Sequence, residues 1–305
     1  MFRRSLSAGS LIVCAFLGLS SGPAVRADEP AAPVKIGMAQ TMVVDVPQPL
    51  VDLLGYPFSG LMKEFTGLNG KLLVGGGPFD LAKKLEDKQV DIGIFQGIEF
   101  AWVQAKYPNL KPLMVVVYQN PKLHVEMLVR KDSGFNSFAD LKGKDVGYPR
   151  KSREHCRCFM EKNCGECGEC APKGYFGAVG RPGSCESALD ELLDGKVHCV
   201  IADKTDVEFY RFLKPGAFSQ FKVVKCSEPF PAAAVVYRDG GVSDKVLDQF
   251  KSGMLKANAS ERGRDMMSMW RITAFEPVPA DYQRTLDDIL KCYPGPGTKV
   301  STGDR

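Results

Sequence analysis

Short apolar runs alternate along the chain with segments in which apolar residues recur at helical spacing. The runs at 34–39, 71–74 and 90–95 have the length of strands, and helical spacing appears over about 50–65 and 79–88. Strands that alternate with helices are typical of a mainly parallel sheet covered by helices on both faces. The first third of the chain is therefore predicted to form one α/β layer structure.

A second set of elements follows a further predicted strand at 114–118. The sequence then predicts a strand at 125–130, a short helix at 138–141, strands at 145–148 and 197–202, a helix at 185–193, a return strand at 232–237, and helices at 246–256 and 281–289. This order implies two lobes and two crossings between them. We expect lobe 1 to comprise 34–128 and 235–305, and lobe 2 to comprise 129–234.

The N-terminus has the pattern of a secretory signal peptide. Arg3 and Arg4 precede an apolar run at 11–19, and small residues near Ala27 suit a signal peptidase. The run is shorter than the roughly 20 residues that span a bilayer. We predict a signal peptide at 1–27 and export to the periplasm. The Sec route is favoured over the twin-arginine route, because Phe2 stands where the twin-arginine pattern prefers Ser or Thr.

The charge of the chain is nearly balanced once the signal peptide is set aside. The chain has 40 Lys and Arg against 36 Asp and Glu. Both signs are interspersed and no dense basic stripe appears, so nucleic acid is not an expected partner.

Several motifs together resemble a known family. The segments 88–95 (KQVDIGIF), 128–134 (LVRKDSG), 138–144 (FADLKGK) and 183–197 occur in the order seen in phosphate, phosphite and phosphonate ABC-transporter binding proteins. The resemblance spans about 34–290. It implies an α/β, two-lobed type II periplasmic binding protein fold, with a ligand cleft between two mixed or parallel sheets covered by helices.

The function that this resemblance implies is transport, not catalysis. The expected partners are a small anionic solute, phosphate-, phosphite- or phosphonate-like, and the permease of an ABC transporter in the inner membrane, and the protein is expected to be a monomer. Helix N-termini that face such a cleft attract anions. Among the residues of the sequence, no nucleophile and base pair stands out, so we predict that the protein is not an enzyme.

The resemblance also assigns candidate ligand-binding residues. They are Gln96, Glu99, Phe100, Lys151, Ser152, Arg153, Ser184, Cys185 and Asp203. Phe100 stands where the family has a cleft tyrosine, and Cys185 replaces a histidine. Ser184 also has the pattern of a helix N-cap, and Asp203 could equally cap the helix after its strand.

A cysteine-rich insertion at 155–171 departs from the family. It contains Cys156, Cys158, Cys164, Cys167 and Cys170. Disulfides within a loop are the first interpretation, because exported cysteines are commonly oxidised. A zinc site, with His155 as a further ligand, and an iron–sulfur cluster remain open as alternatives. No cofactor is expected if the disulfides form.

Two other functions stay open at this point. A metal- or cluster-binding redox or carrier protein could use the binding-protein scaffold and the cysteine-rich segment. A sensory protein could present its ligand-bound form to a receptor in place of a permease.

Overall fold

The computed structural model describes residues 32–43, 48–118, 122–168 and 171–296, and the described residues from Pro33 onward form one compact unit. The predicted signal peptide at 1–27 lies outside the described residues. No helix in the described part of the chain is long and apolar enough to cross a bilayer.

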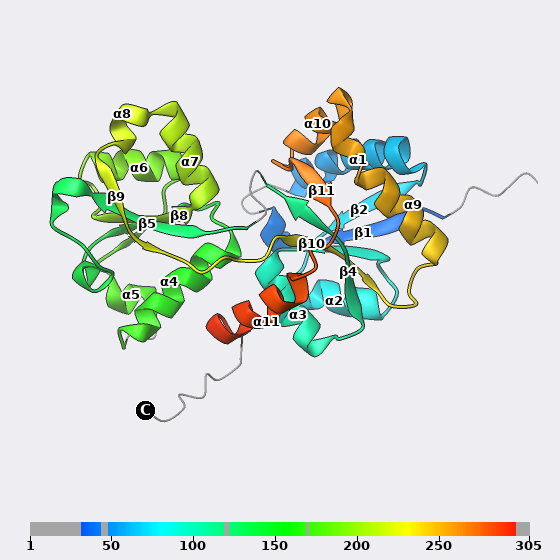
Figure 1. The fold of residues 1–305 in the computed structure, drawn as a ribbon, viewed down its shortest axis with the longest axis horizontal. Helices are drawn as coiled ribbons and strands as arrows, with labels where there is room; N and C mark the ends of the chain where they lie inside the picture. Colours follow the sequence, from blue (N-terminus) through cyan, green and yellow to red (C-terminus); the bar gives the residue numbers. More distant parts are fainter. Residues whose placement is uncertain (1–31, 44–47, 119–121, 169–170, 297–305) are drawn as a thin grey trace, which may run out of the picture. The chain divides into compact units, whose positions relative to one another are not determined.

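The described strands form two mixed sheets (Figure 1). The first sheet has the order β11-β4-β10-β3-β1-β2. Its strands are β1 (Val34–Met38), β2 (Gly70–Val74), β3 (Ile92–Phe95), β4 (Leu110–Val117), β10 (Ala233–Arg238) and β11 (Ala274–Glu276). The parallel strands β1, β2 and β3 lie at one side, and β10 pairs antiparallel with both β3 and β4.

The first sheet has an apolar core on each face. Successive side chains of β10 alternate between these cores, because side chains of a strand point to opposite faces. Ala233 and Val235 pack with α1, α9 and α10, whereas Ala234 and Val236 pack with α2, α3 and α11. The helices are α1 (Gln48–Thr66), α2 (Pro78–Glu86), α3 (Gly97–Lys106), α9 (Asp244–Met254), α10 (Glu261–Ser268) and α11 (Tyr282–Cys292), with short 3-10 turns η1 (Gln40–Met42) and η4 (Ala257–Ala259).

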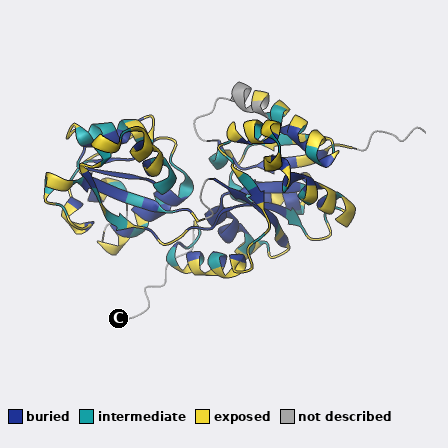
Figure 2. Ribbon diagram, turned by 45° about the horizontal axis from the view of Figure 1, so that its top comes forward, coloured by how far each residue is buried: buried dark blue, intermediate teal, exposed yellow. Residues whose placement is uncertain are grey.

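The second sheet has the order β7-β6-β8-β5-β9. Its strands are β5 (Val125–Arg130), β6 (Val146–Gly147), β7 (Val179–Gly180), β8 (Cys199–Asp203) and β9 (Phe221–Cys226). Its helices are α4 (Glu154–Glu166), α5 (Pro172–Tyr175), α6 (Cys185–Leu193), α7 (Lys204–Leu213) and α8 (Pro215–Phe218), with η2 (Lys131–Ser133) and η3 (Ala139–Leu141). Figure 2 shows the central strands of both sheets buried beneath helices whose outer faces are exposed.

These sheets confirm the predicted α/β fold class with two mixed sheets covered by helices. The apolar runs correctly predicted β1, β2, β3, β5 and β8, and the helical spacing predicted α1, α2, α6, α9 and α11 within a few residues. The helices α3, α4, α7 and α10, the short helices α5 and α8, and the strands β7, β9 and β11 were not predicted from the pattern. In particular, the cysteine-rich segment that was predicted as a loop forms helix α4 over most of its length.

The chain passes between the sheets from β4 to β5 and again from β9 to β10. The two crossings pair with each other, because the backbones of Leu123 and Phe230 exchange hydrogen bonds of 3.2 and 2.8 Å. Ser227 adds a third bond, accepting from the backbone N–H of Val125 at 2.9 Å. The predicted lobe boundaries stay a prediction, but the two crossings lie near them.

Gly97 provides a test of how closely α3 approaches the second crossing. A Cβ atom at this position would collide with the carbonyl oxygens of Pro231 and Ala232. We expect Gly97→Ala to lower the free energy of unfolding by about 1–3 kcal/mol, the usual cost of overpacking, as measured by urea unfolding. Gly165→Ala is the matched control. It adds a methyl group to α4 where no atom lies within 4 Å, so it should be neutral or stabilising by about 0.5–1 kcal/mol. Equal effects of the two substitutions would contradict the close approach.

Candidate functional site

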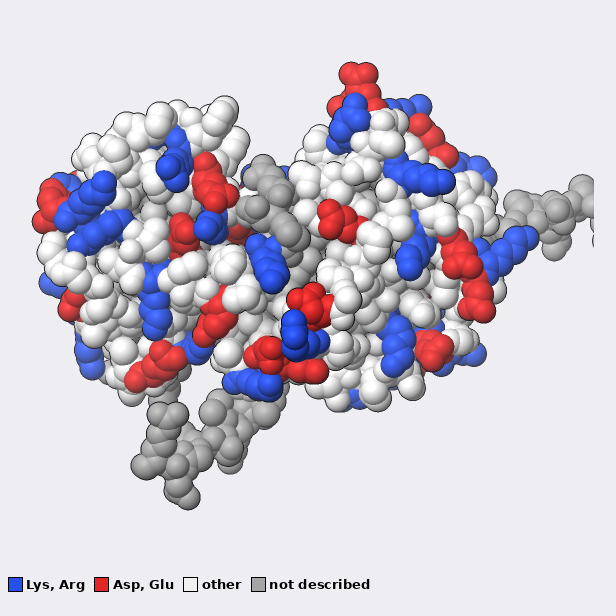
Figure 3. All heavy atoms as spheres, viewed as in Figure 1, with Lys and Arg blue, Asp and Glu red and all other residues white. Residues whose placement is uncertain are grey.

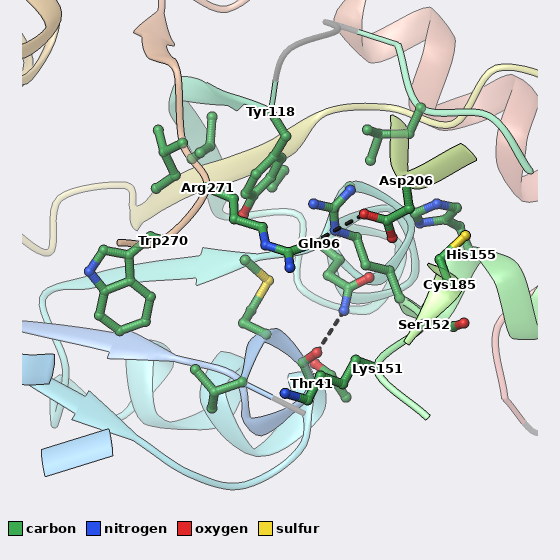
Figure 4. A pocket seen from close by; sticks show the side chains of 18 of the residues that line it. Thr41, Gln96, Tyr118, Lys151, Ser152, His155, Cys185, Asp206, Trp270 and Arg271 are labelled. Atoms are coloured by element: carbon green, nitrogen blue, oxygen red, sulfur yellow. Dashed lines mark hydrogen bonds and ion pairs between the residues drawn. The ribbon is translucent and has the colours of Figure 1, made fainter. Parts of the chain in front are cut away.

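A cavity of about 530 Å³ is lined by residues of both sheets and their helices. Its polar lining comes from the segments that follow β1, β3, β6 and β8, and from the first turn of α6. These are carboxyl ends of parallel strands, where open α/β sheets bind their ligands. Figure 4 shows the side chains that converge on the cavity.

A buried carboxylate organises the second-sheet side of the cavity. Asp203 ends β8, and its side chain is 2% exposed. Its Oδ2 accepts hydrogen bonds from Arg153 Nη1 and His155 Nε2, each at 2.9 Å, and its Oδ1 accepts from the backbone N–H of Thr205 at 2.8 Å. Burial alone would raise the pKa of Asp203, but His155 and Arg153 outweigh it and hold this pKa well below its ordinary value. Asp203 is therefore an ionised anchor for two side chains of the cavity.

Arg153 is held from a second direction by an aromatic ring. Its guanidinium lies 4.4 Å from the ring centroid of Tyr118, which follows β4 of the first sheet. An arginine carries five N–H donors, and the bond to Asp203 engages one of them. Arg153 is thus fixed between the two sheets with further donors for an anion.

Gln96 joins the two sides through its amide group. Its Nε2 donates to the carbonyl oxygen of Thr41 at 2.9 Å (Figure 4), and its Oε1 accepts from the backbone N–H of Glu154 at 3.1 Å. Glu154 is the first residue of α4, so Gln96 satisfies a donor that the helix itself leaves unpaired. The side chain connects the first sheet to helix α4.

Glu99 lies in the first turn of α3, next to Gln96. It is 1% exposed, and its Oε2 accepts from the backbone N–H of Gln96 at 3.3 Å. Burial raises the pKa of Glu99 to about 7, against the lowering effect of Thr41 and with a smaller contribution from Glu154.

The structure separates the predicted ligand-binding residues into two groups. Gln96, Lys151, Ser152, Arg153, Ser184 and Cys185 line the cavity. Glu99, Phe100 and Asp203 are buried and outside its lining. The structure therefore does not bring these three side chains to the cavity with the other six. The register of α3 is the reason for two of them, because Gly97 and Ile98 face the cavity and the next two residues face the core.

Ser184 has the structural role that its sequence pattern also allowed. Its hydroxyl accepts from the backbone N–H of Ser187 at 3.1 Å, which makes it the N-cap of α6. Asp203 likewise caps α7 through Thr205. The N-terminal end of α6 also lines the cavity, with the residues Gly183, Ser184, Cys185 and Glu186.

The cysteines of α4 serve as buried apolar side chains. Cys156, Cys158 and Cys164 lie in the same core as Phe159 and Met160. The thiols of Cys156, Cys158 and Cys167 form no disulfide in the structure, so the predicted disulfides have no pair among these three. Cys170 lies outside the described residues. Within the described part of the chain, no three His, Cys, Asp or Glu side chains gather as a metal site.

Burial keeps the cavity thiol protonated. The pKa of Cys185 is raised well above its ordinary value by burial, and the negative charges of Asp206 and Asp203 raise it further. The nucleophilic and metal-binding form of cysteine is the thiolate. Cys185 therefore contributes a small, weakly polar surface to the cavity.

Sequence reasoning missed several cavity residues. Thr41, Tyr118, Asp206 and Arg271 line it, and so do Met267, Met269 and Trp270. Arg271 Nη1 reaches Asp206 Oδ1 at 3.2 Å, from the first-sheet side to α7. Trp270 is half-buried and Arg271 is exposed, and both follow the amphipathic helix α10. A tryptophan beside an arginine at the end of such a helix was an available signal.

The two mixed sheets, the paired crossings and the cavity at the strand ends are the architecture of periplasmic binding proteins. The family model of ABC transporter, phosphonate, periplasmic substrate-binding proteins matches residues 55–282. The chain belongs to this family, whose members are binding components of transporters. No curated protein sequence matches the chain.

Solved structures with this fold are similar over most of the chain. A Xanthomonas citri protein bound to ATP has a TM-score of 0.61 and 16% identity, covering 86% of this chain and 97% of that one. PhnD1 from Prochlorococcus marinus in complex with methylphosphonate has a TM-score of 0.59 and 15% identity, covering 85% and 97%. A binding protein of an ABC phosphonate transporter from Pseudomonas aeruginosa has a TM-score of 0.57 and 16% identity, covering 85% of each chain. At these identities the likeness shows the fold alone.

Glu99 predicts a specific pH dependence of stability. Its folded-state pKa of about 7 lies above the ordinary value of 4.5, so the folded protein holds this proton more tightly than the unfolded chain. The free energy of unfolding should therefore fall as pH rises from 4.5 to 7, by on the order of 3 kcal/mol for this group. Glu99→Gln keeps an acceptor for the Gln96 N–H and should remove the decrease.

Urea unfolding of wild type and Glu99→Gln at several pH values between 5 and 8 measures this difference. Glu276→Gln, at an exposed glutamate of β11, is the matched control and should retain the wild-type slope. Parallel pH profiles for wild type and Glu99→Gln would show that Glu99 is ionised throughout this range.

Proposed function

We propose that this protein captures a small oxyanion of the phosphonate class in the cavity and delivers it to the permease of an ABC transporter. The observation that carries the proposal is the basic and hydroxyl run Lys151, Ser152 and Arg153, which lines the cavity between β6 and α4 in a member of this family. Export to the periplasm, by the Sec route, is part of the proposal.

The cavity supplies the groups that a tetrahedral oxyanion requires. Lys151 and Arg153 provide positive charge, and charge-assisted hydrogen bonds to oxyanions are stronger than neutral ones. The first turns of α4 and α6 add the positive ends of two helix dipoles. Because Asp203 and Tyr118 already fix Arg153, binding would cost little ordering of this side chain.

The proposal assigns the attraction for an anion to the cavity. On the face shown in Figure 3, Lys and Arg side chains are interspersed with Asp and Glu, without a broad patch of one sign. Methylphosphonate in the Prochlorococcus protein and ATP in the Xanthomonas protein share phosphorus oxyanion chemistry, which supports this choice of ligand class.

Ligand capture can be communicated through the contacts that connect the two sheets. Gln96 contacts the first residue of α4, and Arg271 contacts Asp206 of α7. A ligand that binds Lys151 and Arg153 while touching the first-sheet wall would favour one relative arrangement of the sheets, since a ligand shifts an equilibrium by its differential affinity. A permease that recognises this arrangement would respond only to the loaded protein. The comparisons give no support to a metal or cluster carrier.

Removal of Lys151 tests the proposal directly. Calorimetric titration of the purified mature protein with methylphosphonate, phosphite and phosphate should give saturable binding of at least one of them. Lys151→Ala should weaken that binding about tenfold, equivalent to about 1.4 kcal/mol, because a charge-assisted contact is lost. Its stability should change little, since Lys151 is exposed.

Lys173→Ala is the matched control, because Lys173 is exposed in α5 and outside the cavity lining. It should bind as wild type does. Absence of binding for all three oxyanions, or an equal loss in both variants, would refute oxyanion capture at this site.

A further inference from the structure

We propose that the ligand carries a ring-sized apolar group beside its anionic head, and that Trp270 and the apolar wall around it receive this group. The inference rests on the proposed function and narrows its substrate class to organophosphonates with an aryl or similarly bulky substituent.

The size of the cavity is the first argument. A simple phosphonate such as methylphosphonate has five heavy atoms and would displace roughly five waters, or about 150 Å³ at the liquid volume of water. The cavity holds about 530 Å³, within the range of pockets that take larger organic ligands. The simple anion would leave most of this volume to water.

The chemistry of the wall is the second argument. The first-sheet side of the cavity is lined by apolar side chains that include Phe58, Leu61, Met267, Trp270 and Phe275. A hydrated oxyanion gains nothing from such a wall, whereas an apolar group gains the free energy of leaving water.

Exposed apolar side chains on α7 face the same cavity. Phe209 is 55% exposed and Leu213 is 47% exposed, and both line it. Met269, at the end of α10, is 52% exposed and also lines it. Large apolar side chains left in water within a cavity are typical of a surface that a ligand covers.

Trp270 and the residues proposed to hold the anionic head lie on different sides of the cavity. Figure 4 shows Trp270 on one side of the cavity and Ser152 and Cys185 on the other, with Gln96 and Arg271 between them. An anionic head at Lys151 and Ser152 would therefore direct its substituent toward Trp270.

The backbone holds Trp270 in this place. Helix α10 ends with the N–H of Arg271 bonded to Ser268 O at 2.8 Å and the N–H of Ile272 bonded to Met267 O at 3.0 Å, the pattern of a Schellman motif. Arg271 has a φ of 56°, a left-handed conformation that favours glycine. Its side chain reaches Asp206 at 3.2 Å, a contact that glycine could not make. The turn thus presents Trp270 and Arg271 to the cavity together.

Titration with methylphosphonate and phenylphosphonate tests the inference, since the two probes share one head group. Wild type should bind phenylphosphonate at least tenfold more tightly by calorimetry. Trp270→Ala should bring the two dissociation constants within about twofold. Phe209→Ser removes an exposed ring from the opposite wall and should also reduce the ratio, even if Trp270→Ala does not fold.

Intrinsic fluorescence gives an independent measurement, because the chain contains two tryptophans. Trp102 is buried in α3, outside the cavity lining, and donates to Tyr293 O at 2.9 Å. In the control variant Trp102→Phe, phenylphosphonate should still change the emission and keep the wild-type affinity ratio. In Trp270→Phe, the emission change should disappear.

The outcomes separate the inference from the proposed function. If wild type binds methylphosphonate as tightly as phenylphosphonate, or more tightly, the apolar subsite is refuted while oxyanion capture stands. If wild type binds neither probe, this inference fails, and the proposed function fails with it when phosphite and phosphate also do not bind. A phenylphosphonate preference that survives both Trp270→Ala and Phe209→Ser would place the substituent elsewhere and overturn the assignment.

Discussion

The cavity depends on the ionised carboxylate of Asp203 in a nearly dry environment. A buried charge is costly unless it is paired and hydrogen-bonded, and here Arg153, His155 and the backbone N–H of Thr205 provide the compensation. The same bonds hold the start of α4 against the end of β8. Removing one partner of such a buried group typically costs about 3–5 kcal/mol, so the requirement to pair Asp203 determines where the segment 151–155 lies. Arg153 and His155 of the cavity are thus positioned by a carboxylate that does not itself line it.

The second constraint is the contact between the two sheets through Gln96. An amide has a donor end and an acceptor end, and here each end is used on a different side, at Thr41 O and at Glu154 N. A glutamate at this position would lack the donor and place a charge beside the buried Glu99. Because Gln96 is a neutral amide, it adds no negative charge beside Glu99. The Glu99 side chain, in the first turn of α3, accepts a hydrogen bond from the backbone N–H of Gln96 itself.

The sequence predicted the layers well and the cavity only in part. Alternating strands and helices follow from local periodicity, so β1 and α6 were found without tertiary information. Helix α4 was missed because glycine and cysteine dominated the interpretation, although Cys156, Phe159, Met160 and Cys164 recur at helical spacing and are all buried. The tertiary pairings of the cavity carry no such local signal. The bond of Arg153 to Asp203 joins residues 50 apart, and nothing in the local sequence indicates it.

The residues proposed to hold the anionic head and Trp270 come from different sheets, and this determines what a ligand must do to connect the two sheets. Lys151, Ser152 and Arg153 accompany the second sheet, whereas Trp270 and its apolar neighbours accompany the first. An anion that contacts only the second-sheet groups binds about equally well whether or not the two sheets are close together. It therefore has little differential affinity for the arrangement that brings the sheets together. A ligand with an anionic head and an apolar substituent gains free energy from both walls. Recognition of the ligand and stabilisation of a permease-competent arrangement would then depend on the same molecule spanning the cavity.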